Sequence, residues 1–353
     1  MKILVGMSGG IDSSVAALLL QEAGHEVVGV TMSIWRKGNP FTGELRKNAC
    51  FGPNEEEDIA EARRISELLG IEYHVLDCAA QYERIVLEDF RSEYMAGRTP
   101  NPCVWCNSLI KFGALPKIAR ESGIGFDKFA TGHYAQVENT DGRWLLKCAV
   151  DSRKDQTYFL YRLTQTQLSE VMFPLGKLNK EEARRLCVEH GFFTGEKDES
   201  QDFYSGDYSD LLQAEPIDGD IVDTKGNVLG HHTGHWNYTI GQRRGLGIAS
   251  ERPLYVISLD ARQNQVVVGH EEETFGSALM AQQMNWIGLE HPSGVYEIQA
   301  KIRSTGTAKP AILEILGEDM VSVRFAEPQK AVTPGQSVVF YQDDLVLGGG
   351  VIR

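Results

Sequence analysis

The residues that most constrain the fold stand at the start of the chain, in the run Gly6-Met7-Ser8-Gly9-Gly10-Ile11-Asp12-Ser13-Ser14. A short apolar segment precedes this run, and an apolar-periodic stretch over residues 15–20 follows it directly. This pattern predicts a strand, a tight loop and a helix. Glycines let the backbone approach an anion closely, and a helix start offers unpaired N–H groups and the positive end of a dipole. The loop therefore predicts a binding site for a phosphate group.

The spacing of this loop separates it from two common nucleotide-binding motifs. It has neither the lysine of GxxxxGK[ST] nor the glycine spacing of GxGxxG, which excludes the P-loop and the Rossmann fingerprint. It resembles instead the SGGxDS loop of the ATP pyrophosphatases (PP-loop enzymes), which adenylate a substrate and release pyrophosphate. A plain strand–helix turn would not require serines and an acid around paired glycines. At such a site, Asp12 is placed to hold Mg2+ or to position a donor.

Length and composition limit the class of protein. A chain of 353 residues is too long for one ordinary core, which predicts two or three domains. Hydrophobic content of 42% and charged content of 24% are typical of a globular protein, and no apolar run approaches membrane-spanning length. The run Ile3–Met7 is too short for a signal peptide, so we expect a cytosolic protein without a membrane partner. The net charge of −14 excludes a globally basic nucleic-acid coat, although RNA contact depends on local basic patches.

Strand and helix signals alternate through the first half of the chain. We expect strands at 25–35, 71–77 and 128–131, and helices at 55–69, 79–95 and 107–122. Asn54 and Glu57 are placed to form a capping box at the start of the first of these helices, and Gly70 to end it. This alternation predicts an α/β fold, a parallel sheet with helices on both faces. Ligands of such sheets bind beyond the carboxyl ends of the strands, where the Ser8–Ser13 loop lies.

The pattern changes in the second half. Asp141-Gly142 predicts a hairpin within 134–150, and two helices are expected, roughly at 165–172 and 180–189. Beyond about residue 206, short β-rich segments alternate with turn residues; those expected are 254–259, 265–268, 296–303, 311–315, 321–325 and 337–341. We therefore expect a PP-loop ATP pyrophosphatase domain (adenine-nucleotide alpha hydrolase-like) over 1–206. A small β-rich central domain over 207–272 and a C-terminal antiparallel β-barrel over 273–353 would follow it.

A pair of cysteines forms the second informative block, in Thr99-Pro100-Asn101-Pro102-Cys103-Val104-Trp105-Cys106-Asn107. The two prolines predict an extended approach, and Cys106 or Asn107 is expected to begin a helix. A thiol at a helix start has its pKa lowered by the dipole, which predicts a reactive thiolate. A single CxxC is compatible with a redox pair, half of a zinc site, or two ligands of an iron–sulfur cluster. No second CxxC exists, which excludes a four-cysteine zinc ribbon.

The other four of the six cysteines differ in their surroundings. Cys148 lies in the predicted hairpin and Cys187 on an amphipathic helix, so both are expected to be small core residues. Cys78 ends a predicted strand and is ambiguous. Cys50 lies in a loop expected to face the same sheet edge as the phosphate loop, which makes it the best third partner of Cys103 and Cys106.

Three further segments carry polar or glycine-rich patterns. Gly132 and His133 follow a predicted strand, where the glycine would let a base or ribose approach the backbone. Residues 154–158 (Lys-Asp-Gln-Thr-Tyr) offer a charge and two polar groups on one turn. The histidines at 231, 232 and 235 have no carboxylate or cysteine at metal-ligand spacing, so a zinc site is not expected. The glycine-rich run 241–247 contains Arg243 and Arg244, a pattern that favours contact with an RNA backbone.

Taken together, these blocks resemble the bacterial tRNA 2-thiouridylase (MnmA/TrmU) family. The resemblance covers nearly the whole chain, in the segments GMSGGIDSS, TPNPCxxCNxxIKF, ATGHYA, KDQTYFLYRL, ESQDF, YTIGQRRGLGI and TPGQSVVFY. It implies an enzyme that uses ATP and Mg2+ to adenylate the C2 oxygen of the wobble uridine (position 34) of tRNA, after which a sulfur nucleophile displaces AMP. A uridine that reacts in this way must leave the anticodon stack.

The resemblance also implies roles for individual residues. ATP would be bound by Gly6, Met7, Ser8, Gly9, Gly10, Ile11, Asp12, Ser13, Met32 and Gly132. Catalysis would involve Cys106 as nucleophile, with Cys103 and Asp12. The tRNA and its target base would contact Asn101, Pro102, Cys103, His133, Lys154, Asp155, Gln156, Arg303, Ser304 and Gln336.

One departure from the family pattern affects the chemistry. Well-known members carry a second catalytic cysteine in an SQDICF-like segment, and this chain has Tyr204 at that position, in 199–205 (ESQDFYS). Tyrosine cannot carry a persulfide, and Cys103 occupies a place that is often aspartate in those relatives. The two-cysteine mechanism therefore does not transfer to this chain.

Sulfur must then be delivered in another way. We expect Cys50, Cys103 and Cys106 to ligate a 4Fe–4S cluster with one open iron, with Cys78 as the alternative third ligand. The rival is a persulfide on Cys106 resolved by Cys103 or Cys50, without a metal. The sulfur donor would be sulfide or a sulfur-relay protein. Two other functions remain open: an ATP pyrophosphatase ligase acting on a small molecule, and a non-catalytic iron–sulfur protein that binds tRNA.

Overall fold

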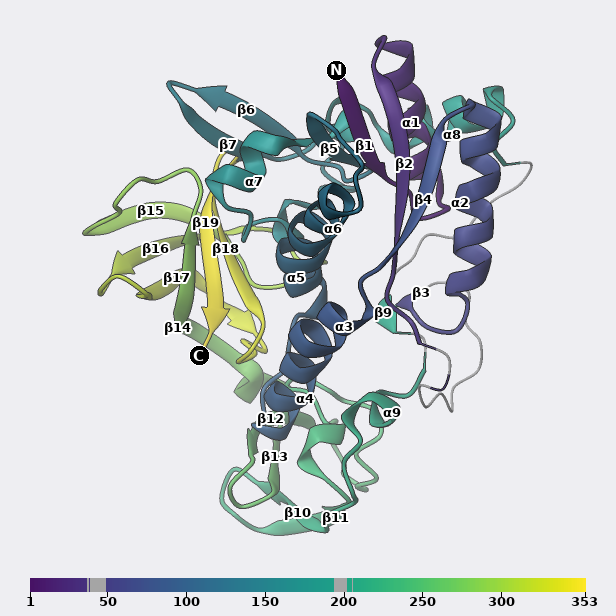
Figure 1. Ribbon diagram of the computed structural model, residues 1–353. Coiled ribbons are helices and arrows are strands. Elements are labelled where there is room, and N and C mark those ends of the chain that lie inside the picture. Colours follow the sequence, from purple (N-terminus) through teal and green to yellow (C-terminus); the bar gives the residue numbers. More distant parts are fainter. Residues whose placement is uncertain (37, 39–48, 194–201, 205) are drawn as a thin grey trace.

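The computed structural model describes residues 1–36, 38, 49–193, 202–204 and 206–353. Figure 1 shows three parts: a parallel sheet with helices at the top, a small sheet at the bottom, and a barrel at the side that carries the C-terminus. No helix in the described ranges is both long and apolar enough to cross a membrane. The predicted architecture, a parallel α/β unit followed by two β-rich parts, is confirmed.

The parallel sheet has the strand order β4-β2-β1-β5-β8. Its strands are β1 (Lys2–Gly6), β2 (Glu26–Ser33), β4 (Glu72–Asp77), β5 (Lys128–Thr131) and β8 (Val171–Met172). Alternate side chains of a strand point to opposite faces. Ile3 and Val5 pack with α1 (Ile11–Glu22), α2 (Glu55–Leu69) and α8 (Lys180–Glu189), whereas Leu4 packs with the helical segments of residues 79–121. Helices therefore cover both faces, as predicted.

The helix α2 begins and ends where the sequence predicted, but its first turn is held differently. Asn54 makes no side-chain cap hydrogen bond, so the expected capping box is absent. The carboxylate of Glu55 instead accepts hydrogen bonds from the Ser33 hydroxyl (2.7 Å) and from the backbone N–H groups of Ile34 (2.7 Å) and Trp35 (3.0 Å). Gly70 ends the helix in the left-handed conformation, as expected (φ 66°). Glu55 thus fastens the carboxyl end of β2 to the start of α2.

Two predicted helices contain a π-helical turn. The first consists of α3 (Ala79–Tyr82), η1 (Glu83–Leu87) and α4 (Glu88–Met95). The second consists of α5 (Pro102–Trp105), η2 (Cys106–Ala114) and α6 (Leu115–Glu121), and it begins earlier than predicted. Pro102 occupies the first helical position, where its missing N–H costs no hydrogen bond. π-Turns are frequent at functional sites, and here one of them begins at Cys106.

The predicted hairpin forms from β6 (Gln136–Thr140) and β7 (Arg143–Lys147), with Asp141 (φ 51°) and Gly142 (φ 87°) in the turn. It extends the barrel sheet through pairing of Lys147 with Leu345. The second predicted helix of this region is α8, with the expected bounds. The first, α7 (Gln165–Glu170), ends two residues early because residues 171–172 form β8 at the sheet edge, next to β5.

The β-rich half forms two sheets. The lower sheet has the order β11-β10-β13-β12, with β10 (Gly219–Asp223), β11 (Val228–His232), β12 (Tyr255–Asp260) and β13 (Gln265–Gly269). The barrel contains β14 (Phe275–Trp286), β15 (Val295–Lys301), β16 (Lys309–Ile315), β17 (Met320–Lys330), β18 (Ser337–Gln342) and β19 (Leu345–Ile352), and pairing of β14 with β19 closes it. Each predicted β segment overlaps one of these strands. The predictions named no strand at β10, β11, β14 or β19.

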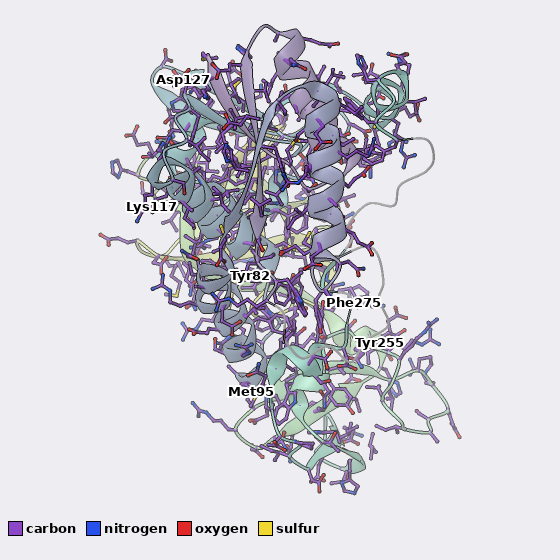
Figure 2. All side chains as sticks on the ribbon, turned by 45° about the vertical axis from the view of Figure 1, so that its right-hand side comes forward. Tyr82, Met95, Lys117, Asp127, Tyr255 and Phe275 are labelled. Atoms are coloured by element: carbon purple, nitrogen blue, oxygen red, sulfur yellow. The ribbon has the colours of Figure 1, made fainter. Side chains whose placement is uncertain are left out.

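Short elements connect these parts. A parallel pair joins β3 (Ala49–Phe51) to β9 (Asp202–Tyr204), and α9 (Tyr208–Leu212) follows. Single 3-10 turns are η3 (Thr157–Phe159), η4 (Pro174–Lys177), η5 (His235–Asn237) and η6 (Glu271–Thr274). Figure 2 shows Tyr82 at mid-height of the molecule and Met95 lower, beside the lower sheet, where the Met95 carbonyl lies 3.2 Å from His235 Nε2.

Candidate functional site

The predicted phosphate loop connects β1 to α1 at the carboxyl edge of the parallel sheet. Ser13 closes it from within, since its hydroxyl oxygen accepts the Ser8 N–H (3.2 Å) and donates to the Gly10 carbonyl (3.0 Å). Gly9 has φ +69°, and a Cβ there would lie 2.5 Å from the carbonyl oxygen of Asp58 on α2. The loop therefore has the glycine it needs both for its turn and for its contact with α2. Met7 is buried beneath the loop, where the Thr31 hydroxyl donates to the Met7 carbonyl (2.6 Å).

Gly132 directly follows β5 and Met32 lies on β2, the two strands on either side of β1. A Cβ at Gly132 would lie 2.5 Å from the carbonyl carbon of Asp12 and 2.7 Å from the nitrogen of Ser13. Any side chain at this position would push the end of β5 away from the start of α1. Met32, near the end of β2, is partly buried and packs on the core below. Both residues thus lie next to the loop, as a nucleotide site requires, although their predicted contacts with ATP stay predictions.

Asp12 has two close partners that the sequence analysis did not identify. Its Oδ1 accepts a hydrogen bond from the Tyr134 hydroxyl (3.1 Å) and forms an ion pair with Lys180 Nζ (2.6 Å). Lys180 is the first residue of α8 and is 168 positions from Asp12 in sequence. The only local signal for it was the Asn179 capping box, which fixes where α8 begins but does not predict what the next side chain contacts.

The residues at the loop suit a magnesium ion that accompanies ATP. Proteins usually hold Mg2+ with one or two carboxylates, while substrate phosphates and water complete its shell. Asp12 supplies one carboxylate, and its side chain is 30% exposed. It is therefore the residue that would hold the metal, which when bound would neutralise phosphate charge.

The thiols gather at the same sheet edge as the loop. Cys78 directly follows β4, and its N–H donates to the Ser33 carbonyl at the end of β2 (2.8 Å). Cys106 lies close enough to Cys78 for its charge to raise the pKa of that thiol, which burial and Asp77 already raise, to about 12. Cys106, the predicted nucleophile, packs against the core cluster that contains Cys78, and Cys78 lies at the carboxyl edge that also bears the phosphate loop.

The pKa of Cys106 differs from the prediction. Its helix begins at Pro102, so Cys106 lies one turn inside and not at the N-terminus. Burial raises the pKa of Cys106 to about 11, while the Lys111 ammonium acts in the opposite direction. The expectation of a lowered pKa was wrong because burial outweighs the helix dipole at this position. The thiol is protonated at neutral pH and must lose its proton when it reacts.

The three predicted cluster ligands all affect the pKa of the Tyr82 phenol. Burial is the largest cause of the raised pKa of the Tyr82 phenol, and the charges of Cys106, Cys103 and Cys50 contribute in that order. In the described ranges, however, no group of three or more His, Cys, Asp or Glu side chains is arranged to hold a metal ion. The arrangement brings the thiols of Cys50, Cys103 and Cys106 near one ring, but it does not fit a 4Fe–4S cluster. Cys187 is buried in the core, as predicted, and Cys148 is partly buried with its Sγ 3.7 Å from the Thr157 hydroxyl.

Tyr204, at the position of the missing family cysteine, is buried and hydrogen-bonded within the protein. The side chain is 3% exposed, and its hydroxyl donates to Asp210 Oδ2 (2.9 Å). Burial first, and then this hydrogen bond, raise the pKa of the phenol. Tyr204 pairs in register with Phe51, one residue after Cys50, so β9 lies beside the strand that carries this cysteine. Residues 199–201 and 205 of the same segment lie outside the described residues.

Several residues predicted to contact tRNA have partners within the protein. Asp155 accepts hydrogen bonds from the Ala149 N–H (3.1 Å) and the Thr157 hydroxyl (2.7 Å), and Gln156 Oε1 accepts the Tyr134 N–H (2.9 Å). Arg303 donates to the Ala331 carbonyl (2.7 Å). These contacts position the segments around them, and the predicted roles in tRNA binding stay predictions.

The other predicted tRNA contacts lie near the thiols or on the surface. Asn101 and Pro102 are buried beside Cys103, and Ser304 is exposed. Lys154 lies at the start of the loop that ends in η3. His133 lies one residue after Gly132, with its Nδ1 2.7 Å from the Thr131 hydroxyl, and burial lowers the pKa of its imidazole well below the usual value. It is therefore neutral and suited to a hydrogen bond with a base, but not to an ion pair with phosphate.

Gln336 joins the barrel to the segment before the thiols. Its Nε2 donates to the carbonyls of Pro100 (2.8 Å) and Thr99 (3.2 Å), and the Thr99 N–H donates to the Pro334 carbonyl (2.9 Å). Gly335 has φ +91°, and a Cβ there would lie 2.7 Å from the Thr99 carbonyl oxygen. The turn 334–336 thus clamps the extended segment that leads to Cys103.

The histidine-rich and arginine-rich segments lie in the lower part. His231 pairs with Asp220 (2.9 Å), His232 Nδ1 accepts the Gly234 N–H (2.9 Å), and His235 Nδ1 lies 3.0 Å from Asn264 Oδ1. These three histidines therefore have separate partners. Arg243 and Arg244 are exposed, as a loop that contacts RNA requires.

Comparison with protein-family models gives matches along most of the chain. The model described as "tRNA methyl transferase HUP domain" matches residues 1–204. The model "tRNA methyl transferase PRC-barrel domain" matches 210–270, and "Aminomethyltransferase beta-barrel domain" matches 276–352.

Curated relatives are similar over their whole length. The "tRNA-specific 2-thiouridylase MnmA" of Endomicrobium trichonymphae is 49% identical, with 100% of this chain and 99% of the relative covered. The protein of the same name from Geobacter metallireducens is 45% identical, with 99% and 96% covered. A solved 4-thiouridine synthetase–RNA complex with bound ATP is 18% identical at a TM-score of 0.34, over 60% of this chain and 42% of that one, a similarity too low to support any inference. With relatives this similar over the full length, the chain belongs to the MnmA family of tRNA-specific 2-thiouridylases.

Proposed function

We propose that this protein is an ATP-dependent tRNA uridine 2-sulfurtransferase that adenylates the C2 oxygen of the wobble uridine, position 34, and replaces this oxygen with sulfur. The observation that carries the proposal is the position of the phosphate loop and the thiols on one edge of one sheet. Cys106 lies near Cys78 at the end of β4, while the Ser8–Ser13 loop follows β1. Activation by ATP and attack by sulfur therefore have their groups on the same side of the molecule, where ligands of parallel sheets bind.

Lys111 acts electrostatically on both Cys106 and His133. Its ammonium lowers the pKa of the Cys106 thiol and also that of His133, which burial lowers most. Gly132, the residue before His133, packs on the backbone of Asp12. A uridine held between His133 and Cys106 would thus lie beside the loop that binds ATP.

The reaction proceeds in two displacements. The uridine C2 oxygen attacks the α-phosphorus of ATP, the bond between the α- and β-phosphates breaks, and pyrophosphate leaves. Sulfur then attacks C2, and the oxygen leaves with AMP. The loop N–H groups and the hydroxyls of Ser8 and Ser13 would hold the phosphates, and Asp12 would hold Mg2+.

For the sulfur step we propose a persulfide and derive nothing through a cluster, since the described thiols do not fit one. A persulfide on a sulfur-relay protein transfers its outer sulfur to the Cys106 thiolate, and the cysteine of that donor leaves as a thiolate. The outer sulfur of this persulfide attacks C2, and Cys103 then attacks Cys106 Sγ, which releases 2-thiouridine and leaves a Cys103–Cys106 disulfide. An external thiol reduces that disulfide and completes the cycle.

We further propose that three parts of the chain bind the tRNA. Residues 1–206 bind the target base, and residues 207–272 contact the phosphate backbone through Arg243 and Arg244. Residues 273–353 contact the backbone through Arg303 and Ser304. The exposure of Arg243, Arg244 and Ser304 supports this division. Because tRNA is the substrate, the cytoplasm is the proposed site of action.

The test measures pyrophosphate release and 2-thiouridine formation together. Purified protein is incubated with ATP, Mg2+, a persulfide donor and tRNA lacking the modification, and the tRNA is digested and analysed by mass spectrometry. We expect pyrophosphate only with tRNA, sulfur only at position 34, and loss of thiolation in Cys106→Ala but not in Cys148→Ala. Pyrophosphate release that needs a small molecule and no tRNA would establish a ligase, and no release at all would establish a non-catalytic protein.

The same assay decides the sulfur chemistry. Protein prepared without oxygen, with iron removed by a chelator, should thiolate at the full rate if a persulfide is used. If activity disappears and returns only with iron and sulfide, the persulfide step is wrong and a cluster is required. Cys50→Ala and Cys78→Ala would then identify the third ligand.

A further inference from the structure

We infer that Lys180 supplies the positive charge that the phosphate loop itself lacks: it binds the pyrophosphate portion of ATP and holds Asp12 in position. The inference rests on the proposed use of ATP. The loop has glycines, hydroxyls and a helix start, but no lysine or arginine between Gly6 and Ser14. The fold brings this cation from α8.

The geometry places the ammonium at the first turn of α1. Lys180 Nζ lies 2.6 Å from Asp12 Oδ1 and 5.7 Å from the centre of the Tyr134 ring, and the Tyr134 hydroxyl donates to the same Asp12 oxygen (3.1 Å). Asp12 is the second residue of α1, directly after the loop. The ammonium thus lies at the end of α1 where the unpaired N–H groups are found.

The position of Lys180 is fixed by several contacts. Asn179 caps α8 with a complete capping box, and the Lys180 N–H donates to Asp151 Oδ2 (3.2 Å). Farther along α8, Ala183 and Cys187 pack in the same core cluster as the apolar face of α1. The two helices are therefore held together so that their N-termini meet and the Lys180 side chain reaches the loop.

Burial distinguishes Lys180 from an ordinary surface lysine. The residue is 5% exposed, whereas the side chain of Asp12 is 30% exposed. Taking an ammonium out of water is unfavourable, and an apolar residue can often replace a buried ion pair without loss of stability. Stability alone therefore does not explain a buried lysine at this position, but a role in binding an anionic ligand does.

The chemistry of adenylation requires such a charge. When the bond between the α- and β-phosphates breaks, negative charge accumulates on the departing pyrophosphate. An ammonium in a partly buried site stabilises that charge more than one in water would, and it needs no proton transfer. Lys180 donates hydrogen bonds first to ATP and then to pyrophosphate.

The experiment compares the affinities of ATP and AMP in the full-length protein without tRNA. Lys180→Met keeps the apolar stem and removes the charge, and Lys180→Arg keeps the charge with a different shape. Arg185→Gln, an exposed cation on the same helix that pairs with Glu189 (3.7 Å), is the matched control. Thermal unfolding of each variant confirms that it is folded.

We expect Lys180→Met to weaken ATP binding by about 10- to 100-fold, the usual effect of losing a hydrogen bond to a charged group, and AMP binding by less than about 3-fold. Arg185→Gln should leave both affinities unchanged. A purely structural ion pair would predict equal changes for the two nucleotides, so an unchanged ratio of ATP to AMP affinity overturns the inference. If Lys180→Met does not fold, the ratio of ATP to AMP affinity is measured in Lys180→Arg. If Lys180 contacts a phosphate, the different shape of arginine changes this ratio. If Lys180 forms only a structural ion pair, the ratio stays the same.

The result separates this inference from the proposed function. Nucleotide binding is measured without tRNA, so a protein that uses Lys180 for ATP but never thiolates tRNA would support the inference and contradict the function. An enzyme that thiolates tRNA, but whose Lys180 variants keep the wild-type ratio of ATP to AMP affinity, would support the proposed function and contradict the inference.

Discussion

At Cys106, two physical effects oppose each other: burial favours the neutral thiol, and the Lys111 ammonium favours the thiolate. The TPNPC segment predicted a thiol at a helix start, where the dipole favours the thiolate. Pro102 begins the helix one turn earlier, and the surrounding protein raises the pKa of the thiol to about 11. Lys111 is the group that counteracts burial, so the reactivity of Cys106 should depend on this lysine.

The alkylation rate of Cys106 should therefore increase with pH far above neutrality. The thiolate is the nucleophile, and its fraction grows about tenfold per pH unit below the pKa. Lys111→Met removes a charge that favours the thiolate, and it should slow alkylation by iodoacetamide at pH 9 by about 3- to 10-fold. The rate is followed by mass spectrometry of the peptide that contains Cys106.

Lys117→Met serves as the control, because Lys117 is exposed on α6 and pairs only loosely with Glu121 (3.8 Å). It should leave the rate unchanged. Alkylation of Cys106 that reaches its plateau near pH 8 would contradict the raised pKa. Equal rates in Lys111→Met and wild type would contradict the effect assigned to Lys111.

Among the elements, the turn between β17 and β18 has a larger role than its place in the barrel suggests. Gln336 donates to two carbonyls of the Thr99–Pro100 segment, so a β-barrel residue determines the path of the chain before Cys103. A hydrogen bond of this kind contributes about 1 kcal/mol, which corresponds to about fivefold in a rate that depends on the correct geometry.

Gln336→Ala should accordingly lower the thiolation rate at saturating tRNA by about 5- to 30-fold, while the affinity for tRNA changes less than about 2-fold. Single-turnover rates and fluorescence anisotropy measure the two quantities separately. Gln342→Ala, an exposed glutamine at the other end of β18, should affect neither. A loss confined to tRNA affinity would show that Gln336 acts as a contact for RNA and not as a clamp.

The elements also show what the sequence could predict. Local signals were sufficient for α8, β5 and the Asp141-Gly142 hairpin, because an amphipathic pattern, a short apolar run and a turn pair each act within a few residues. They failed at Asn54, whose expected cap is replaced by a contact from Glu55 to the end of β2. The site followed the same rule: the loop and Cys106 were predicted from local patterns, whereas Lys180 and the Gln336 clamp depend on contacts between distant segments.

Across the whole molecule, the net charge of −14 opposes binding of a polyanion such as tRNA. Binding must then depend on a few local cations. Arg243 and Arg244 are exposed in a glycine-rich loop beside the lower sheet and are the strongest candidates. Each phosphate contact releases counterions, so its contribution is visible in the salt dependence of the affinity.

Replacing both Arg243 and Arg244 by alanine should weaken tRNA binding and reduce the slope of log affinity against log salt by about 1.5. Fluorescence anisotropy over about 50 to 200 mM salt measures this slope. Arg252→Ala is the matched control, because Arg252 lies nearby in sequence but already pairs with Glu272 (2.8 Å). An unchanged slope in the double variant would exclude this loop from the phosphate contacts.

The clamp formed by residues 334–336 affects when the nascent chain can complete its catalytic segment. Gln336 is 236 positions beyond Pro100, so on the ribosome the catalytic segment emerges long before its clamp does. At ordinary synthesis rates the delay is on the order of ten to fifty seconds. Throughout that interval the ATP loop has already been translated, but the segment that leads to Cys103 lacks its contacts with residues 334–336. The extended segment before Cys103 can therefore take its final path only after the C-terminal barrel has been synthesised and has folded.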